Sequence, residues 1–110
     1  KTQLNLEEIV SISNKIGMEY VEAKKKAEYY ELLKPSKRAQ AMEKYDNEKR
    51  SEAKIKRLAE TDPDYLQFIS QLVEAKSNCE KLKIRYESYK NLFEAKRSLL
   101  SYQKAEMNIL

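Results

Sequence analysis

The sequence predicts an all-α protein, either a helical hairpin or a three-helix arrangement, with a long, coiled-coil-like C-terminal helix. Glycine occurs once and proline twice in 110 residues, whereas a sheet protein of this size needs many turn-forming residues. Good helix formers such as Lys, Glu, Ala and Leu dominate the composition. Apolar residues recur with a helical period along most of the chain. The length fits a single domain over residues 1–110.

The first helix is expected over residues 6–34. Asn5 and Glu8 have the spacing of a capping box, in which each side chain accepts a hydrogen bond from the other residue's backbone N–H. Gly17 lies within the helix, where its missing side chain permits a bend or a close contact with another helix. Pro35 is expected to end the helix, because proline has no N–H and disfavours helical geometry in the residue before it. One face of this helix carries apolar residues at spacings of three and four: Ile9, Ile12, Ile16, Tyr20, Ala23, Ala27 and Tyr30.

A second helix is expected over residues 36–60, with Ser36 as its N-cap. Its apolar positions are sparse, and the stretch "DNEKRSE" at 46–52 has none. This middle piece is therefore either a solvated helix or a partly mobile one, and the sequence leaves the continuity of the helix open there.

The third helix is expected over residues 63–107. Asp62 is its cap, Pro63 fits the first helical position, and Asp64 favours the positive end of the helix dipole. Eleven of thirteen positions at alternating steps of three and four are apolar, which is a heptad pattern. We call these positions the seam: Tyr65, Phe68, Leu72, Ala75, Cys79, Leu82, Tyr86, Tyr89, Phe93, Lys96, Leu100, Gln103 and Met107.

The seam has two candidate partners, the shorter helices of the same chain and the same helix of another subunit. Since the seam is too long to be covered by one small chain, we expect a homo-oligomer that buries residues 89–107. The aromatic residues near the C-terminus alternate with basic ones, which is also typical of a surface that stacks on nucleic acid bases. Their place on the seam favours inward packing. The expected oligomer interface comprises Leu82, Tyr86, Tyr89, Phe93, Leu100 and Met107.

The composition argues against an enzyme. Histidine, the commonest general base, is absent. Cys79 lies on the seam and is expected to be buried and inert. One glycine cannot form a phosphate-binding loop. We therefore expect no catalytic residue, metal or cofactor. A cluster of carboxylates could hold a metal, but its basic neighbours favour an ordinary lattice of i,i+4 charge pairs: Glu43, Asp46, Glu48 and Glu52.

The same features favour a cytoplasmic location. The single cysteine cannot form an internal disulfide, which fits a reducing compartment. No run of apolar residues is long enough to cross a membrane, and no signal peptide is visible.

Positive charge is concentrated in the middle of the chain. The net charge is +4, and residues 36–61 hold eight basic and five acidic residues while contributing few apolar ones. Such a segment is a candidate phosphate-binding surface, with salt-sensitive and sequence-independent binding. The alternative is an ordinary solvated helix face. The candidate nucleic-acid-binding residues are Lys37, Arg38, Lys49, Arg50, Lys54 and Arg57.

The organisation of the chain resembles the small recombination-mediator proteins of phages. The resemblance rests on the Lys-rich stretch "EAKKKAEYY", the basic middle, and the junction "LAETDPDY" that leads into a long terminal helix. It implies a ring-like helical oligomer that binds single-stranded DNA and helps to load a recombinase. The alternative function is a structural or adaptor coiled coil that binds another protein. A basic face would favour the first function, and a bare apolar strip on the long helix would favour the second.

Overall fold

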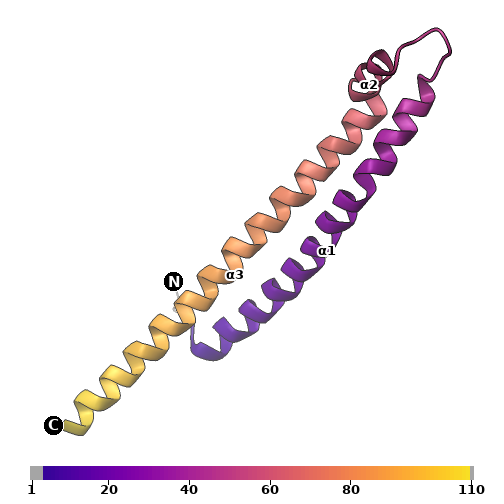
Figure 1. Ribbon diagram of the computed structural model, residues 1–110. Helices are drawn as coiled ribbons and strands as arrows, with labels where there is room; N and C mark the ends of the chain where they lie inside the picture. Colours follow the sequence, from indigo (N-terminus) through magenta and orange to yellow (C-terminus); the bar gives the residue numbers. More distant parts are fainter. Residues whose placement is uncertain (1–3, 110) are drawn as a thin grey trace. The chain divides into compact units, whose positions relative to one another are not determined.

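The computed structural model describes residues 4–109, which form three helices: α1 (Leu6–Lys44), α2 (Glu52–Glu60) and α3 (Pro63–Ile109) (Figure 1). The described residues contain no strand, so the prediction of an all-α fold with a long C-terminal helix is confirmed. Contacts divide the described residues into two units. Unit 1 combines the residues up to Glu22 with those from Glu80 on, and unit 2 is Ala23–Cys79.

The helix starts follow local sequence signals. The Asn5 N–H donates to Glu8 Oε1 at 2.9 Å, and the Glu8 N–H donates to Asn5 Oδ1 at 2.8 Å, which confirms the capping box. Asp62 caps α3 as predicted, because its Oδ2 accepts from the Tyr65 N–H at 3.1 Å. Ser51, which the sequence analysis did not single out, caps α2 by accepting from the Lys54 N–H at 3.2 Å.

The predicted break at Pro35 is wrong, because α1 continues through this residue to Lys44. A proline inside a helix removes one backbone hydrogen bond and costs about 3 kcal/mol. Packing on both sides opposes this cost, since Ala27 before Pro35 and Ala41 after it are both buried. Lys37 and Arg38, just beyond the proline, also contact α3 and α2 through their side chains. Tertiary contacts therefore override the local signal, and Ser36 is not a cap.

The predicted helix over residues 36–60 is divided between two elements. Its first part belongs to α1 and its last part is α2, with turns over residues 45–51. Asn47 organises these turns, because its Oδ1 accepts from the Lys49 N–H at 2.8 Å and its backbone carbonyl accepts from the Arg50 N–H at 3.0 Å. The predicted continuous helix over residues 36–60 is therefore wrong, because residues 45–51 have no apolar face to bury and form turns between α1 and α2.

Unit 2 has a closed core between α1, α2 and the first turns of α3. Its α1 and α3 segments run antiparallel, since Lys44 contacts Asp64, near the start of α3, and Glu31 contacts Lys76, further along it. Ala59 of α2 is completely buried against Ala41 and Tyr65. The seam of α3 faces this core at four successive positions that are all buried: Tyr65, Phe68, Leu72 and Ala75.

Unit 1 has a thinner core, formed by the start of α1 and the later part of α3. Ile9 and Ile16 of α1 are buried. Gly17 makes the close helix contact that its position allowed, because a Cβ atom there would lie 3.0 Å from Cε1 of Tyr86. The seam of α3 is only half-buried in this unit at Leu82, Tyr86, Tyr89, Phe93 and Lys96.

Candidate binding surfaces

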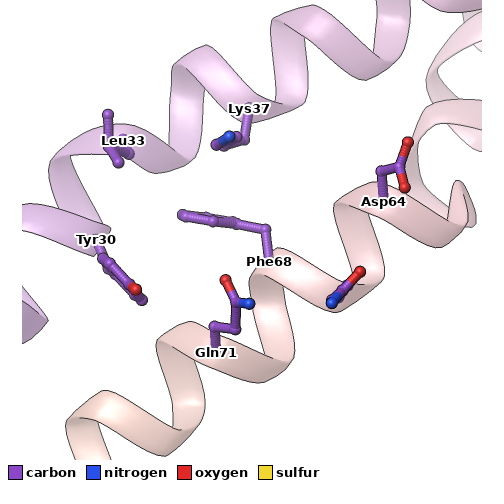
Figure 2. A pocket seen from close by; sticks show the side chains of 7 residues that line it. Tyr30, Leu33, Lys37, Asp64, Phe68 and Gln71 are labelled. Carbon is purple, nitrogen blue, oxygen red and sulfur yellow. The ribbon is translucent and has the colours of Figure 1, made fainter.

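The first candidate surface is a groove in unit 2 that contains one of the predicted basic residues (Figure 2). The groove has a volume of about 340 Å³ and is open to solvent. The Phe68 ring projects from α3 toward α1, and the Lys37 ammonium lies 5.8 Å from its centroid. Tyr30 closes one side of Phe68, with the ring centroids 5.8 Å apart. Lys37 is therefore half-buried and engaged in a cation–π contact.

The end of α1 is tied to the α2–α3 junction by Asp62, whose side chain is buried, with the residue only 2% exposed. Its Oδ1 accepts from Lys44 Nζ at 2.8 Å and from the Tyr45 hydroxyl at 2.7 Å. These two donors lower the pKa of Asp62 to about 2, since both stabilise the charged carboxylate. The same contact raises the pKa of Lys44 and of Tyr45.

This carboxylate is engaged in contacts that hold the fold together. Both of its oxygens already accept hydrogen bonds, from Lys44, Tyr45 and the Tyr65 backbone. A buried carboxylate whose pKa is held low by permanent partners is typical of a structural clasp rather than of a general base. Asp62 therefore fixes the junction between the three helices of unit 2.

Two further predicted basic residues make contacts within the chain. Arg38 forms an ion pair with Glu60 at 3.2 Å, which joins α1 to the end of α2. Arg50 Nη1 donates to the Tyr45 carbonyl at 2.8 Å, which satisfies a backbone group at the end of α1. Like Lys37, these side chains therefore have structural roles that the sequence analysis did not foresee.

The other three predicted residues, Lys49, Lys54 and Arg57, are exposed. Their side chains make no hydrogen bond or ion pair within the described part of the chain. Lys54 and Arg57 are three residues apart on α2, so they share one face. Lys49 lies in the loop that leads to the Ser51 cap of the same helix. The six predicted residues thus divide into three with contacts in the chain and three that are free to meet a ligand.

Two aromatic residues of unit 1, Tyr20 and Tyr86, pack against each other within the chain. The rings of Tyr20 and Tyr86 stack with their centroids 6.5 Å apart and an interplanar angle of 22°. Lys90 Nζ lies 5.5 Å from the centroid of the Tyr86 ring. Tyr86, which was expected at an oligomer interface, therefore contacts the first helix of its own chain, as inward packing requires.

The seam beyond Lys96 is uncovered. Leu100 is 52% exposed and Met107 is 73% exposed. Leu92, Leu99 and Tyr102 widen the apolar surface on one side of the seam and are exposed as well. We call this surface the α3 end: Leu92, Leu99, Leu100, Tyr102 and Met107. It is an apolar strip on the long helix, of the kind that the adaptor alternative requires.

The described residues contain neither of two kinds of site, a metal-binding cluster or a membrane-spanning helix. No group of three or more carboxylate, thiol or imidazole side chains among them could hold a metal ion. Cys79 is half-buried on the seam and forms no disulfide. None of the described helices combines the length and the apolar character that crossing a membrane requires.

Comparisons with protein families, with curated proteins and with solved structures find no match for this chain. The function therefore rests on the surfaces described above.

Proposed function

We propose that this protein is a non-enzymatic helical accessory protein whose α3 end binds another helix. The observation that carries the proposal is the exposure of the apolar α3 end. An apolar heptad strip in contact with water is stabilised when a second helix covers it, because burial of apolar surface is favourable. Exposed contiguous apolar surface on a folded chain is typical of an interaction site.

The proposal is tested with amphipathic helical peptides that present a leucine heptad seam, together with sedimentation of the protein alone. We expect either a peptide or a second copy of the chain to bind the α3 end. Leu100→Glu places a charge in the strip and should abolish binding. Ser98→Glu, two residues away and off the seam, should leave it unchanged. The proposal fails if neither peptides nor a second copy bind to the wild-type protein.

A second candidate function is binding of single-stranded nucleic acid by an assembly of such chains. The observation that favours it is the set of three free basic side chains around α2, namely Lys49, Lys54 and Arg57. One chain with three such residues would bind phosphates weakly, whereas several copies along one strand would gain by multivalency. The resemblance to phage recombination mediators supports this candidate, and recombinase loading would be its biological context.

Titration of a labelled single-stranded oligonucleotide at low and high salt tests this second function. Reversal of all three residues, Lys49→Glu, Lys54→Glu and Arg57→Glu, should abolish binding, and added salt should weaken wild-type binding steeply. Arg50 is left intact because it holds the end of α1. A matched control reverses the same charge elsewhere on the surface, at Lys15, Lys24 and Lys81. Equal loss in both triple variants would show that only net charge matters, and an unshifted oligonucleotide at low salt would exclude the function.

A further inference from the structure

The α3 end carries basic residues along one side of its seam. Lys90, Arg97 and Lys104 each follow a seam residue directly and are spaced seven residues apart, so they lie on one line beside the seam. All three are exposed. We call them the basic flank. In helix pairs, residues at such flanking positions meet charged residues of the facing helix.

Unit 2 provides an example of this arrangement within the same chain. Lys76 belongs to the same line of α3, two repeats before Lys90. Its Nζ donates to Glu31 Oε2 of α1 at 2.8 Å, and the contact lowers the pKa of Glu31. At Lys76, where α1 covers the seam, a basic residue on this line meets a carboxylate of the covering helix.

The seam itself contains a charge at the edge of the α3 end. Lys96 lies between Phe93 and Leu100 on the seam and is half-buried. A lysine at a core-facing heptad position lowers the stability of pairings that leave it unsatisfied and thereby selects the partner. Lys96 is best satisfied by an acidic residue opposite it.

A second copy of the α3 end is a poor occupant for this surface. In a parallel pair, Lys96 would face Lys96 of the other copy across the seam. In an antiparallel pair, the basic flank of one copy would face the basic flank of the other. Both arrangements place like charges together, which is destabilising.

A nucleic acid strand is also a poor occupant of the basic flank. Glu87 and Glu94 stand three residues before Lys90 and Arg97, on the solvent side, and are exposed. Arg97 Nη2 donates to Glu94 Oε1 at 2.7 Å within the helix. Phosphates on this face would meet those carboxylates. A facing helix would meet the seam side instead, and exposed pairs such as Arg97–Glu94 are weak enough to be replaced.

We propose that the α3 end binds an amphipathic helix of a different protein, whose apolar seam is flanked by Asp or Glu. The apolar side of this partner covers Leu99 and Leu100. Its acidic flank meets Arg97 and Lys104, and a carboxylate near its seam meets Lys96. The proposal rests on the proposed helix-binding function and names the class of helix that is bound.

The test uses three peptides with the full-length protein, and binding is followed by fluorescence anisotropy. The first has a leucine seam with glutamates on its flanks and one near its seam. The second is identical except that lysines replace the glutamates. The third copies residues 89–109 of this chain. We expect the acidic peptide to bind more tightly than the basic one by on the order of tenfold or more, since attraction is exchanged for repulsion at several positions.

Charge-reversed protein sharpens the test. Arg97→Glu with Lys104→Glu should invert the preference, so that the lysine peptide binds more tightly. The matched control is Ser98→Glu with Ala105→Glu. It places acidic residues one position after Arg97 and Lys104, away from the seam, and should keep the preference for the acidic peptide. Added salt should reduce the discrimination because exposed pairs are screened. Circular dichroism checks that both variants keep their helices.

The outcomes separate the proposal from the function on which it rests. Equal binding of the acidic and basic peptides would overturn the acidic partner but leave helix binding intact. Binding of the copied segment, or self-association that Leu100→Glu abolishes, would overturn it in favour of a second copy. Failure of every peptide to bind, with the protein monomeric in sedimentation, would overturn both.

Discussion

Units 1 and 2 contain parts of the same two long helices, yet the seam of α3 is covered to different degrees in them. In unit 2 the seam residues from Tyr65 to Ala75 are buried, and α2 adds a third helix to the core. In unit 1 the seam residues from Leu82 to Lys96 are half-buried, and those beyond are exposed. The same alternation of steps of three and four runs through both, although Lys96 and Gln103 interrupt the apolar seam in unit 1. A heptad pattern therefore predicts which face of a helix is apolar, but not how completely that face is covered.

The polar contacts between helices differ between the two units in the same direction as the burial of the seam. In unit 2, ion pairs join α1 to α2 and α3 at Arg38–Glu60, Lys44–Asp62 and Glu31–Lys76. The polar contact seen in the α3 part of unit 1, Arg97–Glu94, lies within one helix. We expect unit 2 to hold most of the stability of the isolated chain and unit 1 to be available for partners.

The largest expected effect comes from replacing one phenylalanine in each unit. Phe68→Ala should cost about 3–5 kcal/mol of unfolding free energy, because a large buried ring is lost from a packed core. Phe93→Ala should cost about 1–2 kcal/mol, since the half-buried ring has less apolar surface to lose. Urea unfolding at low protein concentration measures both, and it keeps association from adding stability.

Equal costs at the two positions would contradict the contrast between the units. If Phe68→Ala does not fold, Phe68→Leu keeps the comparison measurable, because this milder change should cost about 1 kcal/mol. The matching variant in unit 1 is Phe93→Leu, which should cost less.

The next effect is the loss of stability in acid when Asp62 is protonated. We call Asp62 and its hydrogen bonds to Lys44, Tyr45 and the Tyr65 backbone the Asp62 clasp. Because the pKa of Asp62 is lowered to about 2 in the folded chain, its ionised form stabilises unit 2 fully above about pH 4, the ordinary value for aspartate. That contribution is lost as the pH falls from about 4 through about 2. Asp62→Asn should lower the thermal midpoint at pH 7 by about 5 °C or more, and the difference from wild type should shrink at pH 2.5.

Thermal melts at pH 7, 4 and 2.5 check this prediction. Asp46→Asn is the control, since Asp46 is exposed and its carboxylate makes no hydrogen bond within the described residues. A difference between wild type and Asp62→Asn that stays constant down to pH 2.5 would show that the clasp acts through its shape rather than its charge.

Much of the fold follows from sequence signals that act locally. The capping box of Asn5 and Glu8 and the cap at Asp62 involve residues three apart, so the sequence predicts them correctly. Pro35 gives an equally local signal, but contacts with α2 and α3 decide its outcome. The sequence offers no sign that Lys37 would reach Phe68, which is thirty-one positions away along the chain.

The candidate sites were less predictable for the same reason. Charge and spacing identified six basic residues, but only the fold shows that Arg38 pairs with Glu60 and that Arg50 holds the Tyr45 carbonyl. The hydrogen bonds from Lys44 and Tyr45 to Asp62 depend on where the end of α1 lies relative to the start of α3, and no local sequence pattern encodes this. The basic flank, by contrast, could have been found as a spacing of seven residues beside the seam, but it was not among the predicted sites. The oligomer contacts stay predictions at all six expected positions: Leu82, Tyr86, Tyr89, Phe93, Leu100 and Met107.

The smallest expected effect probes the close contact in unit 1. In an unconstrained helix, Gly17→Ala would stabilise by about 1 kcal/mol, because alanine has the higher helix propensity. Here the added Cβ would lie 3.0 Å from Cε1 of Tyr86. That ring is held by stacking on Tyr20 and by Lys90. We therefore expect Gly17→Ala to have almost no net effect in the wild-type chain.

Removal of the Tyr86 ring should allow Gly17→Ala to stabilise the helix. In a Tyr86→Ala background, Gly17→Ala should stabilise by about 1 kcal/mol, so that urea unfolding of the four proteins gives a coupling of that size. Ser11→Ala, at an exposed position of the same helix, should have the same effect in both backgrounds. If Gly17→Ala stabilises the wild type as much as the Tyr86→Ala variant, the ring yields without cost. Unit 1 would then be looser than the stacking of Tyr20 on Tyr86 indicates, and its half-buried seam would open readily to a partner helix.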